Sequence, residues 1–516
     1  MLNNMKIENL NFGNIEGKNE FKGKKIEDLY LDIFNADKVI KEKKYYIYGN
    51  KGTGKTSLLR YLEYKVSQEK KKTLIILFKD IKKNISIYSK FKKLINESLD
   101  HDMATQAFWQ WLLLSIIVQE NKIDVDEKKL IFNAKDKFFK KISNLFMAIT
   151  QGLKGKYNQD GIEVELDASK IKLEDNNDSL EEAGENIDYL SALVNSNLKN
   201  GYYIFIDELE TSSITSTNRE DSILIKNLIN SISFLNSVHK NLHIVVAVRT
   251  EILDNIYTIG DEINKLLESE GIEIKWIYDK YNIQHPLIKM IIKKMRLSMI
   301  EYSPNDEQKI RMENENNIFK RWFPEQLLSE LNSKKGDNAK IILHNTWLKP
   351  RDLVRFMNIM KEKAKMHTSF KRKHYDDAVK EYSQKAWIEI KEELSANLEP
   401  DKIESLEECL SNFKTRFFYS ELQNRLKTKI NEDTEKIILL LFKIGVIGNN
   451  YKQGKNFVFK YYYRGDKHLD KDNEIEIHRG LWKAFSLKVI RGTQIQPEVE
   501  MVNSALHEQL QSLNIR

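Results

Sequence analysis

The octapeptide Gly49-Asn50-Lys51-Gly52-Thr53-Gly54-Lys55-Thr56 lies between a short apolar run, Tyr45–Tyr48, and a helical pattern, Ser57–Val66. It fits the pattern G-x-x-x-x-G-K-[ST] in the strand-to-helix context that this pattern requires. Its glycines let backbone N–H groups turn inward around phosphate oxygens, and the N-terminus of the following helix adds the positive end of a dipole. The stretch therefore predicts a phosphate loop that binds a nucleoside triphosphate.

The loop also predicts which residues contact ATP and Mg²⁺. Lys55 would reach the β- and γ-phosphates, and the Thr56 hydroxyl would bind Mg²⁺. The residues expected to bind the nucleotide are Gly49, Asn50, Lys51, Gly52, Thr53, Gly54, Lys55, Thr56 and Ser57.

Around this loop, the first half of the chain alternates short apolar runs with helical patterns, which is typical of a parallel α/β sheet. The runs are nearly continuous in apolar residues, as in strands that are covered on both faces. The predicted strands are Tyr45–Tyr48, Thr73–Phe78, Tyr202–Ile206, Leu242–Val248 and Ile272–Ile277.

The interval from Phe78 to Tyr202 is far longer than one crossover helix needs, so it predicts an insertion. Strict alternation in Ile162-Glu163-Val164-Glu165-Leu166 predicts a hairpin strand within it. The aromatic residues near position 110 are expected in the core. The insertion's predicted helices are Thr105–Gln119, Lys128–Gln151 and Ser179–Leu198.

Two strand ends supply further candidate catalytic residues. Asp207-Glu208 ends an apolar strand, so Asp207 would hold Mg²⁺ and Glu208 would polarise an attacking water. This glutamate favours hydrolysis over transfer to a small acceptor. Arg249 ends the strand expected between the other two and would face the γ-phosphate. The alternative is that Arg249 merely ends a strand.

All six prolines lie after residue 285, and residues 281–395 have a helical pattern. Pro286 and Pro350 are placed as at helix starts. In Lys349-Pro350-Arg351-Asp352-Leu353-Val354-Arg355-Phe356, Arg351 would contact the γ-phosphate from a helical lid, with Arg355 one turn later on the same face. The alternative is a helix with ordinary surface arginines.

Residues 400–490 predict three short helices, a turn at Asn449-Asn450 and a strand, Phe457–Tyr463, as in a winged-helix domain. The aromatic side chains of that strand fit either a buried face or a wing on a nucleic-acid backbone. His344 and His478 are expected to be structural. The predicted helices are Leu406–Phe413, Ser420–Leu426 and Thr434–Ile444.

The expected fold is thus α/β: a parallel-sheet P-loop NTPase core with a helical insertion, a helical lid and a C-terminal winged-helix-like domain. The expected domains are the core at 1–280 with its insertion at about 83–200, the lid at 281–395 and the C-terminal domain at 396–516.

The composition bounds the function. Of 516 residues, 41% are hydrophobic and 31% are charged, which excludes a disordered chain. The single cysteine, Cys409, excludes an internal disulfide framework and a zinc ribbon. No signal peptide or membrane span is predicted, so a cytoplasmic protein without a membrane partner is expected. The net charge of +7 comes mostly from lysine and fits either nucleic-acid binding or a solvated surface.

The order of phosphate loop, Asp-Glu strand, strand-end arginine and Pro-Arg helix resembles the origin-recognition, STAND and KAP-like branch of AAA-type (ASCE) ATPases over residues 40–400. With the late Ile477-His478-Arg479-Gly480-Leu481-Trp482, it looks like bacterial stand-alone P-loop ATPases, many of them from phage-defence or mobile-element loci. The resemblance implies ATP-dependent switching or assembly on double-stranded DNA or with an effector protein. The long insertion departs from the pattern, and Arg219 is only a weak candidate for an arginine finger acting in trans.

Two hypotheses follow. The first is an ATPase that couples nucleotide state to assembly or DNA transactions, with the winged helix reading DNA. The second is a nucleotide-gated scaffold that forms homo-oligomers and recruits an effector protein without contacting DNA. A small-molecule kinase is disfavoured by Glu208 and by the large C-terminal part.

Overall fold

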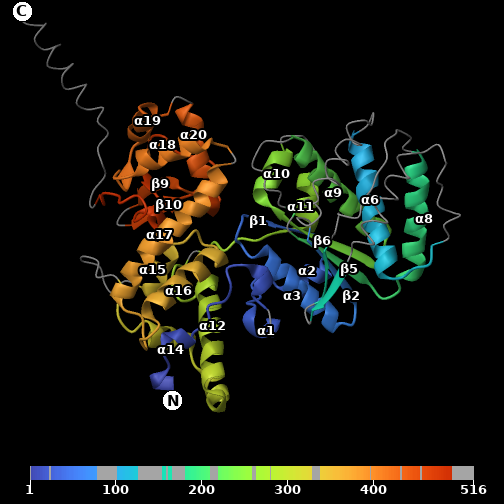
Figure 1. Ribbon diagram of the computed structural model, residues 1–516, viewed down its shortest axis with the longest axis horizontal. Helices are drawn as coiled ribbons and strands as arrows, with labels where there is room; N and C mark the ends of the chain where they lie inside the picture. Colours follow the sequence, from blue (N-terminus) through green and yellow to red (C-terminus); the bar gives the residue numbers. More distant parts are fainter. Residues whose placement is uncertain are drawn as a thin grey trace, which may run out of the picture. The chain divides into compact units, whose positions relative to one another are not determined.

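The computed structural model describes residues 2–21, 25–77, 101–125, 154–158, 161–165, 181–207, 209, 219–257, 263–278, 280–327, 337–395, 397–430, 433–453 and 456–490. The chain forms two compact units. The α/β unit is Gly13–Trp276, and the C-terminal unit combines Met1–Phe12 with Ile277–Arg516. Figure 1 labels the helices and strands of both units.

The described strands of the α/β unit form one sheet in the order β3-β4-β2-β5-β6-β1-β7. Its neighbouring strands run parallel, except in the β3–β4 hairpin. The strand that ends in Arg249 lies between the strands that end in Gly49 and Asp207, as predicted. The bounds are β1 Tyr46–Gly49, β2 Lys72–Leu77, β3 Lys154–Asn158, β4 Gly161–Glu165, β5 Tyr202–Asp207, β6 Leu242–Arg249 and β7 Gly271–Glu273.

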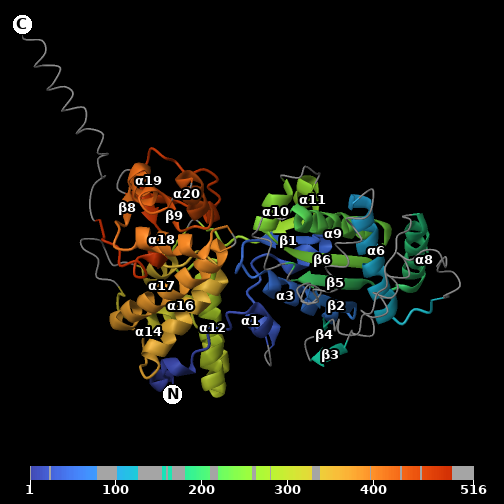
Figure 2. The same ribbon diagram turned by 45° about the horizontal axis from the view of Figure 1, so that its top comes forward.

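Helices cover both faces of this sheet. Figure 2 shows α3 (Lys55–Gln68) on one face and α9 (Arg219–Val238) on the other. Both faces of β5 are therefore buried, which explains its continuous apolar sequence. The remaining helices of the unit are α1 Ile26–Leu29, α2 Ala36–Lys41, α6 His101–Glu120, α8 Glu181–Asn197, α10 Thr250–Tyr257 and α11 Ile263–Glu270.

The insertion packs into the α/β unit through α6, which contacts α8 and α9. The predicted helices near 105–119 and 179–198 are confirmed, and the predicted helix at 128–151 lies outside the described residues. The predicted hairpin strand is β4, which also pairs in parallel with β2 and so extends the sheet. The aromatic residues of α6 are buried, as expected for core: Phe108, Trp109 and Trp111.

The C-terminal unit begins with a helical part. Pro286 and Pro350 occupy first-turn positions of α12 and α16, as predicted. The bounds are α12 Pro286–Tyr302, α13 Glu307–Met312, α14 Glu315–Trp322, α15 Asn338–His344, α16 Pro350–Ala364 and α17 Arg372–Leu394.

Residues 2–12 pack with this helical part, although the expected core at 1–280 included them. Backbone N–H groups of Ile7 and Glu8 donate to His367 and Lys365 at 2.8 and 3.1 Å. The apolar side chains of this short segment are buried, so they extend the core of the C-terminal unit: Met5, Ile7, Leu10 and Phe12. The expected boundaries between core, lid and C-terminal domain stay predictions.

A second group of elements follows α17. Its strands form an antiparallel sheet in the order β10-β9-β11-β8. The bounds are α18 Pro400–Leu410, β8 Arg416–Phe417, α19 Tyr419–Lys427, α20 Thr434–Lys443, β9 Ile447–Gln453, β10 Asn456–Lys460 and β11 Ile475–Ile477.

Three of the local predictions were wrong. Asn449 and Asn450 lie inside β9 rather than in a turn, because their side chains hydrogen-bond to Asp470 and Glu476 and the hairpin turns further on. The predicted strand at 457–463 ends at Lys460, and a 3₁₀-helix, Tyr462–Arg464, follows. Likewise, β7 ends at Glu273 and not near Ile277.

Candidate functional site

The phosphate loop connects β1 directly to α3. Gly52 and Gly54 have φ angles of 83° and 94°, in the left-handed region that favours glycine. Gly54 caps α3, so Lys55, Thr56 and Ser57 form its first turn. Since the first N–H groups of a helix lack partners within the helix, this end of α3 favours an anion.

Lys55 is buried within the loop, with a relative exposure of 7%. Its Nζ donates to the carbonyl oxygens of Gly49 and Asn50 at 2.8 and 3.0 Å. The hydroxyl of Thr53 also donates to the Asn50 carbonyl, at 2.9 Å. The loop is thus folded around an ammonium group, which is the charge that a triphosphate requires.

Gly49 is fixed by sterics rather than by its φ angle. A Cβ atom at this position would lie 2.9 Å from both the Ile274 carbonyl oxygen and the Thr53 hydroxyl oxygen. Any other residue would therefore push the loop away from the segment that follows β7.

The other strand-end candidates lie at the same sheet edge as the loop. Arg249 is the register partner of Gly49, and Asp207 is the register partner of Leu77. Asp207 is buried, with a relative exposure of 6%. Because carboxyl ends of parallel strands share one edge, Arg249 lies beside the start of the loop, and Asp207 lies one strand further along the same edge. Glu208 lies outside the described residues.

Arg351 lies in the C-terminal unit, in the first turn of α16. Its Nη1 is 3.4 Å from a carboxylate oxygen of Glu389 on α17, and the other oxygen of Glu389 is 2.5 Å from Arg355. Arg351 and Arg355 thus share a face and a partner. Burial raises the pKa of the adjacent Asp352 carboxyl.

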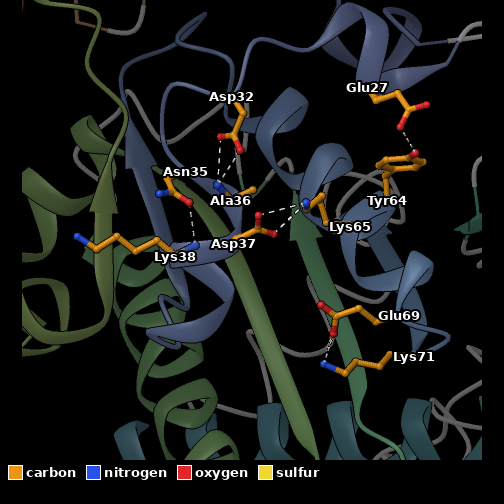
Figure 3. A network of polar contacts seen from close by, with 10 residues as sticks. All are labelled: Glu27, Asp32, Asn35, Ala36, Asp37, Lys38, Tyr64, Lys65, Glu69 and Lys71. Atoms are coloured by element: carbon orange, nitrogen blue, oxygen red, sulfur yellow. Dashed lines mark hydrogen bonds and ion pairs between the residues drawn. The ribbon is translucent and has the colours of Figure 1, made fainter.

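The N-terminal segment of the α/β unit braces the helix that carries the loop. Figure 3 shows Glu27 accepting a hydrogen bond from Tyr64, and Asp37 paired with Lys65. These contacts measure 2.6 and 2.9 Å. They join α1 and α2 to the same helix, α3.

The sequence interpretation missed one residue that contacts the phosphate loop, Trp276. Its indole Nε1–H donates to the Thr53 carbonyl at 2.8 Å. The Phe34 ring packs edge-on against the indole, with centroids 5.8 Å apart and planes at 90°. The only signal was a tryptophan at the end of an apolar run, and the run was interpreted as a strand.

The aromatic run of the C-terminal unit is mainly a packing feature. Tyr461 is buried and stacks on Tyr463, with ring centroids 5.2 Å apart. His478 is stacked on Trp347 at 4.0 Å and hydrogen-bonded to the Tyr463 hydroxyl at 3.1 Å. His344 packs edge-on against Tyr281 and Phe459, with ring centroids 5.3 and 6.1 Å apart, and burial lowers its pKa to about 3. Both histidines therefore have the structural role that was predicted.

Two family models match parts of the chain. Residues 18–213 match the ORC-CDC6-like family, and residues 288–391 match the FunZ-associated C-terminal helical domain. No curated protein matches the sequence. The first match supports an AAA ATPase of the ORC/CDC6 type for the region that contains the phosphate loop. The fold is accordingly an α/β P-loop core followed by a helical C-terminal part.

This class implies a nucleotide and usually Mg²⁺. Across the part of the chain that the structure describes, no group of three or more His, Cys, Asp or Glu residues is arranged to hold a metal ion. A Mg²⁺ site of the expected kind needs only one or two protein ligands, because phosphate oxygens and waters supply the rest. Among the same residues, no helix is long and apolar enough to cross a membrane.

Proposed function

We propose that this protein binds and hydrolyses ATP at the phosphate loop and uses the nucleotide state to control DNA transactions or assembly. The observation that carries the proposal is the buried Lys55 ammonium inside a glycine loop, with Arg249 at the end of the neighbouring strand and Asp207 at the end of the next strand. A buried cation beside a helix N-terminus and a buried carboxylate is suited to a triphosphate with its metal.

Each candidate residue then has a defined role. Lys55 exchanges the carbonyls of Gly49 and Asn50 for the β- and γ-phosphates. Thr56 and Asp207 would hold Mg²⁺, which neutralises phosphate charge when bound. Glu208 orients and polarises the attacking water.

Two arginines would respond to the γ-phosphate. Arg249 faces it from the end of β6 and stabilises the charge that develops during hydrolysis. Arg351 is held by Glu389 at 3.4 Å in this structure, so contact with the γ-phosphate requires it to change partner. Such an exchange would make the α16 helix a sensor of hydrolysis.

The C-terminal elements support the DNA arm of the proposal. The order α18, β8, α19, α20, β9 and β10 matches the helix, strand, helix, helix, strand and strand order of a winged helix, and β11 follows as a further strand. With the resemblance to bacterial stand-alone ATPases, it extends the proposal to phage defence or mobile-element biology.

A nucleotide-gated scaffold is the second candidate, because the insertion adds a hairpin to the sheet and β3 is the edge strand among those that the structure describes. Edge strands offer unpaired backbone groups to a partner chain. This scaffold would form homo-oligomers or recruit an effector protein without contacting DNA.

Steady-state ATP turnover with and without double-stranded DNA tests the proposal, with Glu208→Gln as the blank. We expect DNA to stimulate the turnover of the wild-type protein. The variant should turn over ATP about a hundredfold or more slowly, because it lacks the general base. Turnover that is the same with and without DNA would favour the nucleotide-gated scaffold. Wild-type turnover no higher than the blank would refute hydrolysis at this site.

A further inference from the structure

The chain segment after β7 runs alongside the phosphate loop. The Ile274 N–H donates to the Tyr48 carbonyl at 2.7 Å, which continues the sheet pairing beyond the strand. The Ile274 carbonyl oxygen lies where a Cβ atom on Gly49 would clash. Two residues later, the Trp276 indole reaches Thr53. The segment therefore touches the loop at its start and near its middle.

The hydrogen bond from Trp276 holds the part of the loop whose backbone conformation depends on two glycines. Thr53 lies between Gly52 and Gly54, the two loop residues with positive φ. Fixing the Thr53 carbonyl fixes the peptide planes whose N–H groups must face the phosphates. Trp276 and Thr53 are both buried, with relative exposures of 7% and 6%, so water does not compete for this bond.

Trp276 is also the last residue of the α/β unit, and Ile277 is the first residue of the long segment of the C-terminal unit. The phosphate loop is thus hydrogen-bonded to the point where the chain leaves its unit. Residues on either side of that point, Lys275 and Lys280, are exposed.

We propose that Trp276 is a positioning residue that holds the phosphate loop in its binding conformation and couples nucleotide occupancy to the connecting segment, residues 277–285. The inference rests on the proposed function, because it takes the loop as the ATP site. When Lys55 leaves the Gly49 and Asn50 carbonyls for phosphate, the loop changes at Gly49, which lies against Ile274, and at Asn50. The Asn50 carbonyl also accepts the hydrogen bond of the Thr53 hydroxyl, so the change reaches the residue that Trp276 holds. The coupling is reciprocal, so loss of the indole bond weakens both nucleotide binding and the response of the segment.

Trp276→Phe tests this by removing the N–H while keeping an aromatic ring against Phe34. Trp109→Phe is the matched control, because the Trp109 indole donates to a backbone carbonyl, that of Leu224, at 3.0 Å in the same unit. In the full chain, calorimetry measures ATP and ADP affinity. Trypsin cleavage after Lys275 and Lys280 reports on the segment.

We expect Trp276→Phe to bind ATP about two- to tenfold more weakly, the range for one lost hydrogen bond. Wild-type and Trp109→Phe proteins should be protected from trypsin by saturating ATP, and Trp276→Phe should lose that protection. If Trp276→Phe fails to fold, Phe34→Leu is the second variant. It keeps the indole hydrogen bond but removes the ring that packs against the indole, so it should lose less ATP affinity and less protection from trypsin.

Wild-type affinity and wild-type protection in Trp276→Phe would overturn this inference and leave the proposed function intact. No ATP binding by the wild-type chain would instead refute the proposed function itself. Equal losses in Trp276→Phe and Trp109→Phe would assign the effect to general destabilisation and also overturn the inference.

Discussion

Both units bury charged side chains, but they stabilise them in different ways. In the α/β unit, the Lys55 ammonium lies against backbone carbonyls of a glycine loop. In the C-terminal unit, the Glu476 carboxylate accepts hydrogen bonds from Arg416 at 3.2 Å and from Asn450 at 2.7 Å. The carbonyls around Lys55 carry only partial charge, so a phosphate is a better partner, whereas Glu476 already has a full counter-charge.

This difference separates a ligand site from a structural network. A buried ion that has exchangeable partners at a loop is suited to binding, and one enclosed by side chains from a sheet is suited to holding that sheet together. Disrupting each region should therefore affect a different property, nucleotide affinity in the α/β unit and stability in the C-terminal unit.

The largest expected effect is the loss of stability in Arg416→Ala. At pH 10, well above the pKa of Glu476, this change leaves the carboxylate buried without its paired cation, at a cost of about 3–5 kcal/mol of unfolding free energy. ATP affinity should not change. Urea unfolding followed by circular dichroism, together with calorimetry of ATP binding, measures both. Lys471→Ala is the control, since its pair with Glu435 is exposed and should contribute little to stability.

Lys55→Ala should lose ATP affinity and keep its stability, the opposite of Arg416→Ala. Removal of the ammonium should weaken ATP binding by about thirtyfold or more, the effect of losing one partner of a buried charge pair, with little change in unfolding. Lys65→Ala, on the same helix, removes a partly exposed pair with Asp37 and no contact within the loop, so its ATP affinity should change far less. A stable Lys55→Ala protein with wild-type affinity would contradict the loop assignment.

The pH dependence of stability sharpens the account of the C-terminal unit. Burial raises the pKa of Glu476 from 4.5 to about 7. The folded chain thus binds the Glu476 proton more tightly than the unfolded chain does. The stability that this protonation contributes is present below pH 4.5 and is lost as the pH rises to about 7. Compared with Glu476→Gln, wild-type stability should fall across this range by at most about 1.4 kcal/mol per pH unit.

His344 and His478 contribute in the opposite direction, since burial lowers their pKa values and stability is lost as the pH falls below 6.5. Both histidines are present in wild type and in Glu476→Gln, so they cancel in the difference. A pH-independent difference between the two proteins would show that Glu476 is not the titrating group.

The parallel core was predictable because its signals are local. The loop motif fixes the strand before it and the helix after it, and β5 and β6 are continuous apolar runs that end in Asp207 and Arg249. By contrast, the contact of Trp276 with Thr53 joins residues 223 positions apart and leaves no periodic trace. The misplaced turn at Asn449 and Asn450 has the same cause, since distant partners override the turn preference of asparagine.

The smallest expected effect is that of Arg351→Ala. Glu389 keeps Arg355 as a partner at 2.5 Å, so stability should change by less than about 1 kcal/mol. Because Arg351 would meet the γ-phosphate only after leaving Glu389, much of its contribution is offset, and its loss should lower ATP turnover by about three- to tenfold, the value of one ordinary hydrogen bond, with ATP affinity nearly unchanged. Arg372→Ala, which breaks an exposed pair with Asp376 on α17, is the control. Unchanged turnover and unchanged assembly in Arg351→Ala would make it an ordinary surface arginine, and the C-terminal unit would then contain no residue that responds to the γ-phosphate among those proposed.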